Sequence, residues 1–431
     1  MRSRTGRGLA LLAAAGALVL ALAGCSGSGG GGTGGDASGC VPSGGHAPRA
    51  GGDKYIVYMN ALNIGNAWQE EAANLGVSVA SMEPYSKCVE VRKELTDGDA
   101  QAQISQVQSM VAAGADAIVM YALSPTALNA AFRDACQQGV TVISYDATVT
   151  EPCVYNVSYL TSIPQGSTHP FMGYNSMTAL AKLIGGKGGI SYAHGVVGTS
   201  TDNIHYNSAM AALKNYPDIK VLTEYEGKWS SSVQQAESAK VLASFPNITG
   251  MWCAYGESGC IKSLKAAGKE IPVTGETSNY FREQLLAGWP GASIGSPPAQ
   301  GGIGMKVALA VLLEGAKGIP LDIEVPYKIV TAENVKVCDK DTYTDGCNVF
   351  PPGKVGDEET ADIFNEMLPE SSLSASQTGK PAAGMTATPY TADYLSKYEQ
   401  DPSRRYVTRE ACPDGWKKAT LPEGVEGCAK G

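Results

Sequence analysis

Polar and aromatic side chains follow several apolar runs of this sequence, at positions where a ligand rich in hydroxyl groups could be bound. Carboxylates and amides exchange hydrogen bonds with hydroxyl groups, and aromatic rings cover the C–H faces of sugars and polyols. We predict that these residues form one site for a small polar ligand. The candidates are Asn63, Asn66, Trp68, Asp146, Trp229, Tyr255 and Glu276.

Each candidate also has a purely structural alternative. Asp146 would suit a helix cap or a turn, and Trp68 would suit the packing of a helix. Trp229 would suit a core, although it stands in the polar stretch 226–230. Tyr255 and Glu276 fit either role.

An alternation of strands and helices must position these residues. Segments 101–113 and 126–138 carry apolar residues at helical spacing, between short apolar runs of strand length. The pattern restarts after Thr161, which predicts an α/β fold with two doubly wound parallel-sheet lobes. Ligands of such sheets bind beyond the carboxyl ends of the strands, where the candidates stand. The expected strands are 55–59, 115–121, 140–145, 189–193, 219–225, 249–253 and 272–275.

The composition disfavours several other functions. The net charge of −9 over 431 residues disfavours a general nucleic-acid role, which needs a basic face. Segment 256–260 lacks the last glycine of a hydrolase nucleophile elbow, and 185–189 lacks the spacing of a phosphate loop. The four histidines are too scattered for a zinc site. We therefore expect no enzyme activity, no cofactor and no metal.

The N-terminus predicts export. Three arginines precede the apolar stretch 9–22, which ends at Leu22-Ala23-Gly24-Cys25. This ending resembles the lipobox of bacterial lipoproteins, which implies a signal peptide over 1–24 and a lipid on Cys25. We expect 25–52 to be a flexible tether that anchors the protein to the outer face of the bacterial cell membrane. The alternative is an ordinary secretion signal with a chance cysteine.

The remaining ten cysteines are an even number, which favours disulfides in an exported protein. Segment 338–431 is rich in Pro, Gly and Ser, so we expect a loop-rich extension stapled by cysteines and continuing from the second lobe. The alternative for this segment is a partly disordered tail. A separate alternative concerns Cys253, which could be a buried free thiol. The predicted pairs are Cys40–Cys88, Cys136–Cys153, Cys253–Cys260, Cys338–Cys347 and Cys412–Cys428.

Three stretches carry a resemblance to a known family. Segment 116–146 ends a strand in Asp146, segment 198–220 begins Gly-Thr-Ser, and 263–269 reads Ser-Leu-Lys-Ala-Ala-Gly-Lys. In order and spacing they resemble the type I periplasmic binding proteins of the ribose and galactose group, over residues 54–330. The resemblance implies a monomeric solute-binding protein that delivers its ligand to an ABC transporter permease.

The resemblance also gives a layout to test. We expect a first lobe of 54–158 plus 299–324 and a second of 161–294 plus 325–337. Three crossings near 157–162, 295–298 and 325–328 would form the hinge.

The sequence departs from the sugar binders of this family at three site positions. Ala147 and Asn203 stand where the family commonly has arginine, and Ser296 stands where it has a hinge-side glutamine. Asn203 and Ser296 join the candidates because of their positions. Losing two guanidiniums removes bidentate donors, so the departures leave the ligand open. The rival roles are a sensor that presents its ligand to a membrane receptor and, less favoured, an exported enzyme.

Overall fold

The computed structural model describes residues 47–97, 99–164, 167–333, 335, 367–400, 416–420 and 426–430. The predicted signal peptide, Cys25 and the tether up to residue 46 lie outside the described residues, as do Cys40, Cys338, Cys347 and Cys412. No helix in the described ranges combines the length and apolar character needed to cross a membrane.

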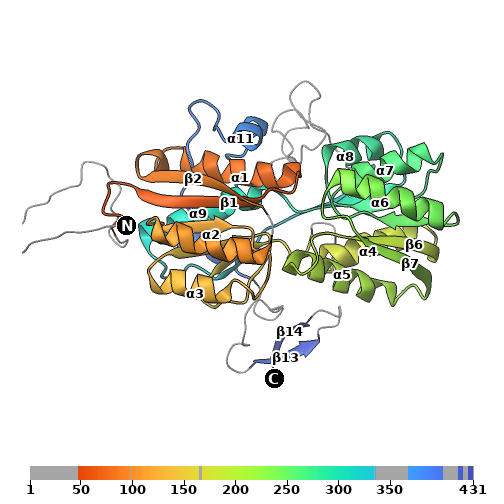
Figure 1. Ribbon diagram of the computed structural model, residues 1–431, viewed down its shortest axis with the longest axis horizontal. Coiled ribbons are helices and arrows are strands. Elements are labelled where there is room, and N and C mark those ends of the chain that lie inside the picture. Colours follow the sequence, from red (N-terminus) through yellow and green to blue (C-terminus); the bar gives the residue numbers. More distant parts are fainter. Residues whose placement is uncertain are drawn as a thin grey trace, which may run out of the picture. The chain divides into compact units, whose positions relative to one another are not determined.

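The first lobe is a parallel sheet with helices on both faces (Figure 1). Alternate residues of β1 enter different cores: Val57 packs with α1 (Ala67–Ala80) and α9 (Ala299–Glu314), and Tyr58 packs with α2 (Ala100–Ala112) and α3 (Asn129–Gln137). A sheet covered on both faces explains its nearly continuous apolar strands. The strand order is β11 (Asp322–Glu324), β5 (Tyr155–Ser158), β4 (Thr141–Tyr145), β3 (Ala117–Met120), β1 (Tyr55–Leu62), β2 (Val89–Thr96).

The second lobe repeats this plan. Its sheet is parallel except for β12, which pairs antiparallel with β10. Helices α4 (Met172–Leu183) and α5 (Ser200–Leu213) pack together, and α6 (Ser231–Ser244), α7 (Glu257–Ala266) and α8 (Asn279–Leu286) form a second layer. The fold prediction of two α/β lobes is therefore confirmed. The strand order is β12 (Ile329–Val330), β10 (Gly291–Ile294), β9 (Val273–Gly275), β8 (Gly250–Trp252), β6 (Lys187–His194), β7 (Asp218–Glu226).

The chain passes between the two sheets three times. It leaves β5 for α4, leaves β10 for α9 through 295–298, and leaves β11 for β12 through 325–328. The first two segments are joined where the Tyr159 amide donates to Gln300 Oε1 at 3.1 Å. The first and third meet where the Val325 amide donates to the Ser158 carbonyl oxygen at 2.9 Å.

The helices of each lobe approach one another closely at glycine. A Cβ on Gly301 of α9 would lie 2.1 Å from the Ala72 carbonyl oxygen of α1. A Cβ on Gly173 of α4 would lie 2.1 Å from the His205 carbonyl oxygen of α5. Both helix pairs therefore depend on the missing side chain.

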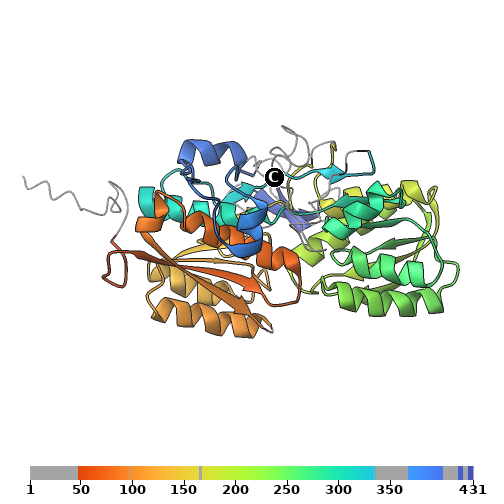
Figure 2. The same ribbon diagram turned by 90° about the horizontal axis from the view of Figure 1, so that it is seen from above.

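The C-terminal extension differs from the prediction. Segment 367–400 packs on the first lobe rather than continuing the second, and it contains α11 (Leu373–Thr378), α12 (Ala392–Leu395) and the 3-10 turn η2 (Ser396–Tyr398) (Figure 1, Figure 2). Its Glu370 pairs with the buried Lys306 of α9 at 3.1 Å. Asn74 of α1 donates to the Ser376 carbonyl oxygen at 2.8 Å. This segment is held by buried polar contacts, which composition does not reveal.

Two of the predicted disulfides are confirmed, Cys136–Cys153 and Cys253–Cys260, so Cys253 is not a free thiol. Cys88 is also disulfide-bonded, and its predicted partner Cys40 lies outside the described residues. Cys428 lies in the hairpin of β13 (Trp416–Thr420) and β14 (Glu426–Lys430). The pairs Cys338–Cys347 and Cys412–Cys428 remain predictions. A short 3-10 turn, η1 (Tyr85–Lys87), precedes Cys88.

Candidate functional site

A small cavity, lined mostly by buried residues, lies at the carboxyl ends of both sheets. Seven of the ten lining residues are predicted candidates. The cavity is lined by Asn66, Trp68, Gln69, Tyr121, Asp146, Thr201, Trp229, Tyr255, Glu276 and Ser296.

The strand ends explain why these residues meet. Asp146 directly follows β4, Glu276 directly follows β9, and Ser296 follows β10. Asn66 caps α1, because its Oδ1 accepts from the Gln69 amide at 3.1 Å. Thr201 lies in the first turn of α5. Parallel strands bring all their carboxyl ends to one edge, so one cavity receives residues from both lobes.

Asp146 joins the two lobes through hydrogen bonds to its carboxylate. Oδ1 accepts from Gln300 Nε2 at 2.8 Å, and Oδ2 accepts from Thr201 Oγ1 at 3.2 Å. The hydroxyl of Tyr121 in turn donates to Thr201 Oγ1 at 3.0 Å. Burial raises the pKa of Asp146 to about 6, while bonds from Gln300, Thr201 and Ser296 act to lower it. The site therefore holds a carboxyl group whose donors come from both walls.

Glu276 is the second buried acid of the cavity. Its side chain lines the space, and the residue is 6% exposed. Burial raises the pKa of Glu276 well above its usual value, and the nearby carboxyls of Glu257 and Asp146 raise it further. Within the described part of the chain, we find no hydrogen-bond donor to the Glu276 carboxylate. This acid is available to a ligand.

Aromatic rings form much of the remaining wall. Trp68 Nε1 donates to the Ser296 carbonyl oxygen at 2.8 Å, and its ring stacks on Tyr145 with centroids 6.4 Å apart. Trp229 meets Tyr121 edge to face, with centroids 6.2 Å apart. Asn66 Nδ2 donates to the Trp229 carbonyl oxygen at 3.1 Å, which fixes Trp229 against the opposite lobe. The two tryptophans thus line the cavity and are held in place by hydrogen bonds.

Two predicted candidates do not reach the cavity. Asn63 is exposed, and its Nδ2 donates to Asp97 Oδ1 at 2.6 Å. Asn203 is exposed on α5. Residues two apart on a helix point in nearly opposite directions, so Thr201 faces the cavity where Asn203 faces away. The strand-end rule that gave Asn63 predicts the region of a side chain but not its direction, and the family position that gave Asn203 does not fix which face of α5 it occupies.

Four residues of the site were missed by the sequence analysis. Tyr121 is the last residue of the run 115–121, so the strand-end rule could have found it. Gln69 lies on α1 beside Trp68, and its Oε1 accepts from the Leu62 amide at 3.1 Å. Thr201 and Gln300 lie in the first turns of helices. Gln300 supplies the hinge-side amide that is missing at Ser296.

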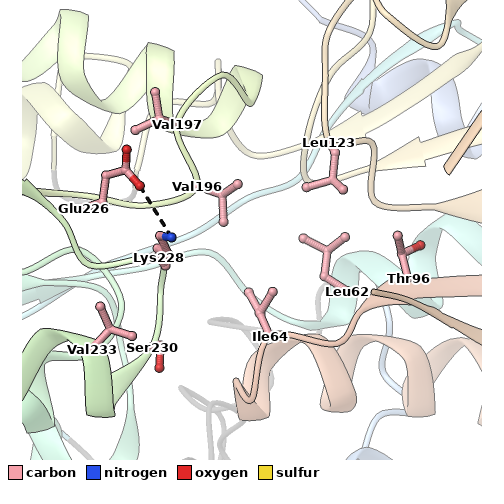
Figure 3. A pocket seen from close by; sticks show the side chains of 10 residues that line it. All are labelled: Leu62, Ile64, Thr96, Leu123, Val196, Val197, Glu226, Lys228, Ser230 and Val233. Carbon is pink, nitrogen blue, oxygen red and sulfur yellow. Dashed lines mark ion pairs between the residues drawn. The ribbon is translucent and has the colours of Figure 1, made fainter. Parts of the chain in front are cut away.

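A wider hollow is lined by residues that stand close in sequence to those of the cavity (Figure 3). Apolar side chains face one another across it, with Leu62, Ile64 and Leu123 on the first lobe and Val196 and Val197 on the second. Its charged members, Lys228 and Glu226, pair with each other at 3.8 Å. The lining of this hollow is therefore mostly apolar.

Gly195 controls the position of Trp229. A Cβ on Gly195 would lie 2.0 Å from Trp229 Cε2. Gly195→Ala should therefore displace the indole and weaken ligand binding, and the overpacking should lower the free energy of unfolding by roughly 1–3 kcal/mol. Calorimetric titration checks this, with Gly52→Ala as the control because a Cβ there meets nothing within 4 Å. Equal affinity in both variants would contradict the assigned position of Trp229.

Two doubly wound lobes with a polar cavity between their strand ends define the two-lobed class of solute-binding proteins. A family model described as a periplasmic binding protein domain matches residues 56–317, which is more than half of the chain. The chain belongs to this family, whose members are binding proteins.

Curated relatives and solved structures agree with this placement. The chain is 26% identical to a xylitol-binding protein of Mycolicibacterium smegmatis, over 61% of this chain and 75% of the relative. It is 22% identical to the D-allose-binding periplasmic protein of Escherichia coli, over 61% and 83%.

Among solved structures, an ABC transporter solute-binding protein from Thermobispora bispora matches with a TM-score of 0.56 at 24% identity, over 66% of this chain and 89% of that one. One from Bacillus halodurans with bound myo-inositol matches with a TM-score of 0.56 at 18% identity, over 66% and 97%. At these identities the structures establish the fold alone.

Proposed function

We propose that this protein is an exported solute-binding protein that captures a small polyhydroxylated ligand and delivers it to an ABC importer, without catalysing a reaction. The observation that carries the proposal is the buried cavity at facing strand ends, with two acids, an amide and aromatic rings. These groups suit hydroxyls and C–H faces. The named ligands of the relatives, xylitol and D-allose, belong to this chemical class.

Capture follows from contacts that span the lobes. In the first lobe we place Asn66, Trp68, Tyr121 and Asp146, and in the second Thr201, Trp229, Tyr255 and Glu276. A ligand that touches both sets binds the closed form more strongly than the open form, and this difference drives closure about the three crossings. The importer would then recognise the closed protein.

A ligand screen tests the proposed function. A thermal-shift panel of pentoses, hexoses, polyols and nucleosides should raise the Tm of the protein with at least one polyhydroxylated member, because a ligand bound only by the folded state stabilises it. At 100 times Kd the gain is about 2.7 kcal/mol of unfolding free energy. A panel in which only nucleosides, or no compound at all, raised the Tm would contradict the proposal.

We also propose that the protein is held at the membrane through a lipid on Cys25, with the segment from Ser26 as its tether. Cys25→Ser should move the protein from the membrane fraction to the soluble fraction of cells, as followed by immunoblotting. A mature N-terminus other than residue 25, or a wild-type protein without lipid by mass spectrometry, would contradict this anchor.

A further inference from the structure

The cavity contains two acids and no cationic side chain. It is lined by Asp146 and Glu276, and no lysine, arginine or histidine is among its ten lining residues. Two buried cations of the described residues lie beside other acids. Lys306 pairs with Glu370, and the charge of Arg282 acts to lower the pKa of Glu257. These cations are therefore occupied by other acids.

The remaining nearby bases do not compensate the two acids. Lys228 lines the wider apolar hollow rather than the cavity. Its side chain is 60% exposed and pairs with Glu226. His205 is fully buried against the Tyr159 hydroxyl at 2.6 Å, and burial lowers the pKa of His205 to about 4, so it is neutral at pH 7. A ligand in the cavity meets two acids and no positive side chain.

The two acids differ in the hydrogen-bond donors that the protein supplies to their carboxyl groups. Asp146 already accepts hydrogen bonds from Gln300 and Thr201. Glu276 is more than nine-tenths buried and faces the same space, without a donor from the described residues. Hydroxyl groups of a neutral ligand would satisfy its hydrogen bonds, whereas an ammonium group would also supply the counter-charge that the ionised form of this buried acid lacks.

The aromatic lining favours the same kind of ligand. Trp68, Tyr121, Trp229 and Tyr255 all line the cavity. The faces of aromatic rings carry partial negative charge and attract ammonium groups, tryptophan most strongly. Buried acids and aromatic rings together are suited to an organic cation. A metal ion is less suited, because no cluster of three or more metal-ligating side chains occurs among the described residues.

We propose that the cavity selects a small hydroxylated ligand that carries a protonated amine, with the ammonium group against Glu276 and the hydroxyls on the remaining polar groups. This inference rests on the proposed function and narrows its ligand class.

The test compares matched pairs that differ in one amino group: D-glucosamine with D-glucose, D-galactosamine with D-galactose, and D-glucamine with D-sorbitol. Calorimetric titration at pH 7 and low salt should give at least about tenfold tighter binding for the amine in the pairs that bind. In Glu276→Gln this preference should fall to within about twofold. The matched control is Glu270→Gln, an exposed acid of the same lobe, which should keep the preference.

The same variant separates a ligand role from a structural one. Because the folded-state pKa of Glu276 lies well above its usual 4.5, this carboxyl favours folding at low pH and opposes it as the pH rises to neutral. Glu276→Gln should therefore raise the Tm of the ligand-free protein at pH 7 while it removes the amine preference. A structural role would lower the Tm instead.

Three outcomes would overturn the inference. If the neutral member of each pair bound as tightly as the amine, the cation selection would be wrong and the proposed function would stand. If Glu276→Gln kept the full preference, the assignment to Glu276 would be wrong. If no amine in the panel bound, the cation selection would be wrong, and if no neutral polyol or sugar bound either, the proposed function would fail with it.

Discussion

Asp146→Ala should weaken binding of the cognate ligand by about 1.5–3 kcal/mol, the range for a lost hydrogen bond to a charged group. The reason is that Asp146 stands at the centre of the cavity, with a donor from each lobe, Gln300 and Thr201. At 25 °C this loss corresponds to an affinity decrease of roughly ten- to 150-fold. Calorimetric titration measures it directly.

The design must separate binding from folding, because Asp146 has a φ of 61°. Alanine is strained in this left-handed region, whereas asparagine tolerates it. Asp146→Asn therefore keeps the backbone, while it removes the charge and replaces one acceptor oxygen by an amide donor. It should weaken binding with a smaller change in Tm than Asp146→Ala. Asp218→Asn, an exposed acid at the start of β7, is the control. Unchanged affinity in both Asp146 variants would rule out the cavity as the ligand site.

Glu370→Ala should lower the free energy of unfolding by about 3–5 kcal/mol, because it leaves the ammonium of Lys306 buried without its partner. The Lys306 side chain is 1% exposed, and its Nζ lies 3.1 and 3.2 Å from the two Glu370 oxygens. It also lies 4.3 Å from the centroid of the Tyr390 ring, which belongs to the same extension. Urea denaturation, followed by circular dichroism, gives the change.

A double variant provides the control. Lys306→Met combined with Glu370→Leu removes both charges and keeps apolar volume, so it should recover most of the lost stability. A change below about 1 kcal/mol in Glu370→Ala would mean that the extension does not stabilise the first lobe. The expected result makes segment 367–400 part of the folded lobe rather than an appendage.

The sequence predicts the elements of the fold well because the periodicity of buried residues is local. The run 55–59 becomes β1, and the segment 101–113 becomes α2 almost unchanged. Doubly wound topology then follows from alternation alone. The packing of the extension could not be predicted, since Lys306 lies in the apolar helix α9 and its partner Glu370 stands 64 residues further along the chain, in a segment of low apolar content.

The sequence predicts that the site lies at the strand ends, but it does not predict every side chain that lines the site. Asp146 and Glu276 directly follow strands, where the chain direction leaves little choice, and both line the cavity. Asn203 was chosen by family position, but the phase of α5 gives Thr201 to the site. Gln300 reaches Asp146 from the first turn of α9, across 154 residues of sequence. Such contacts depend on how segments far apart in the sequence pack against one another, which no local pattern encodes.

Small-angle scattering, with and without saturating ligand from the panel, tests most directly whether the ligand binds between the lobes and closes them. We predict that the radius of gyration of the wild-type protein falls when the ligand binds, because a ligand that contacts both lobes favours the closed form. The Trp229→Ala variant at the same ligand concentration should show a smaller change or none. A radius of gyration unchanged by a ligand that calorimetry shows to be bound would contradict the interlobe site.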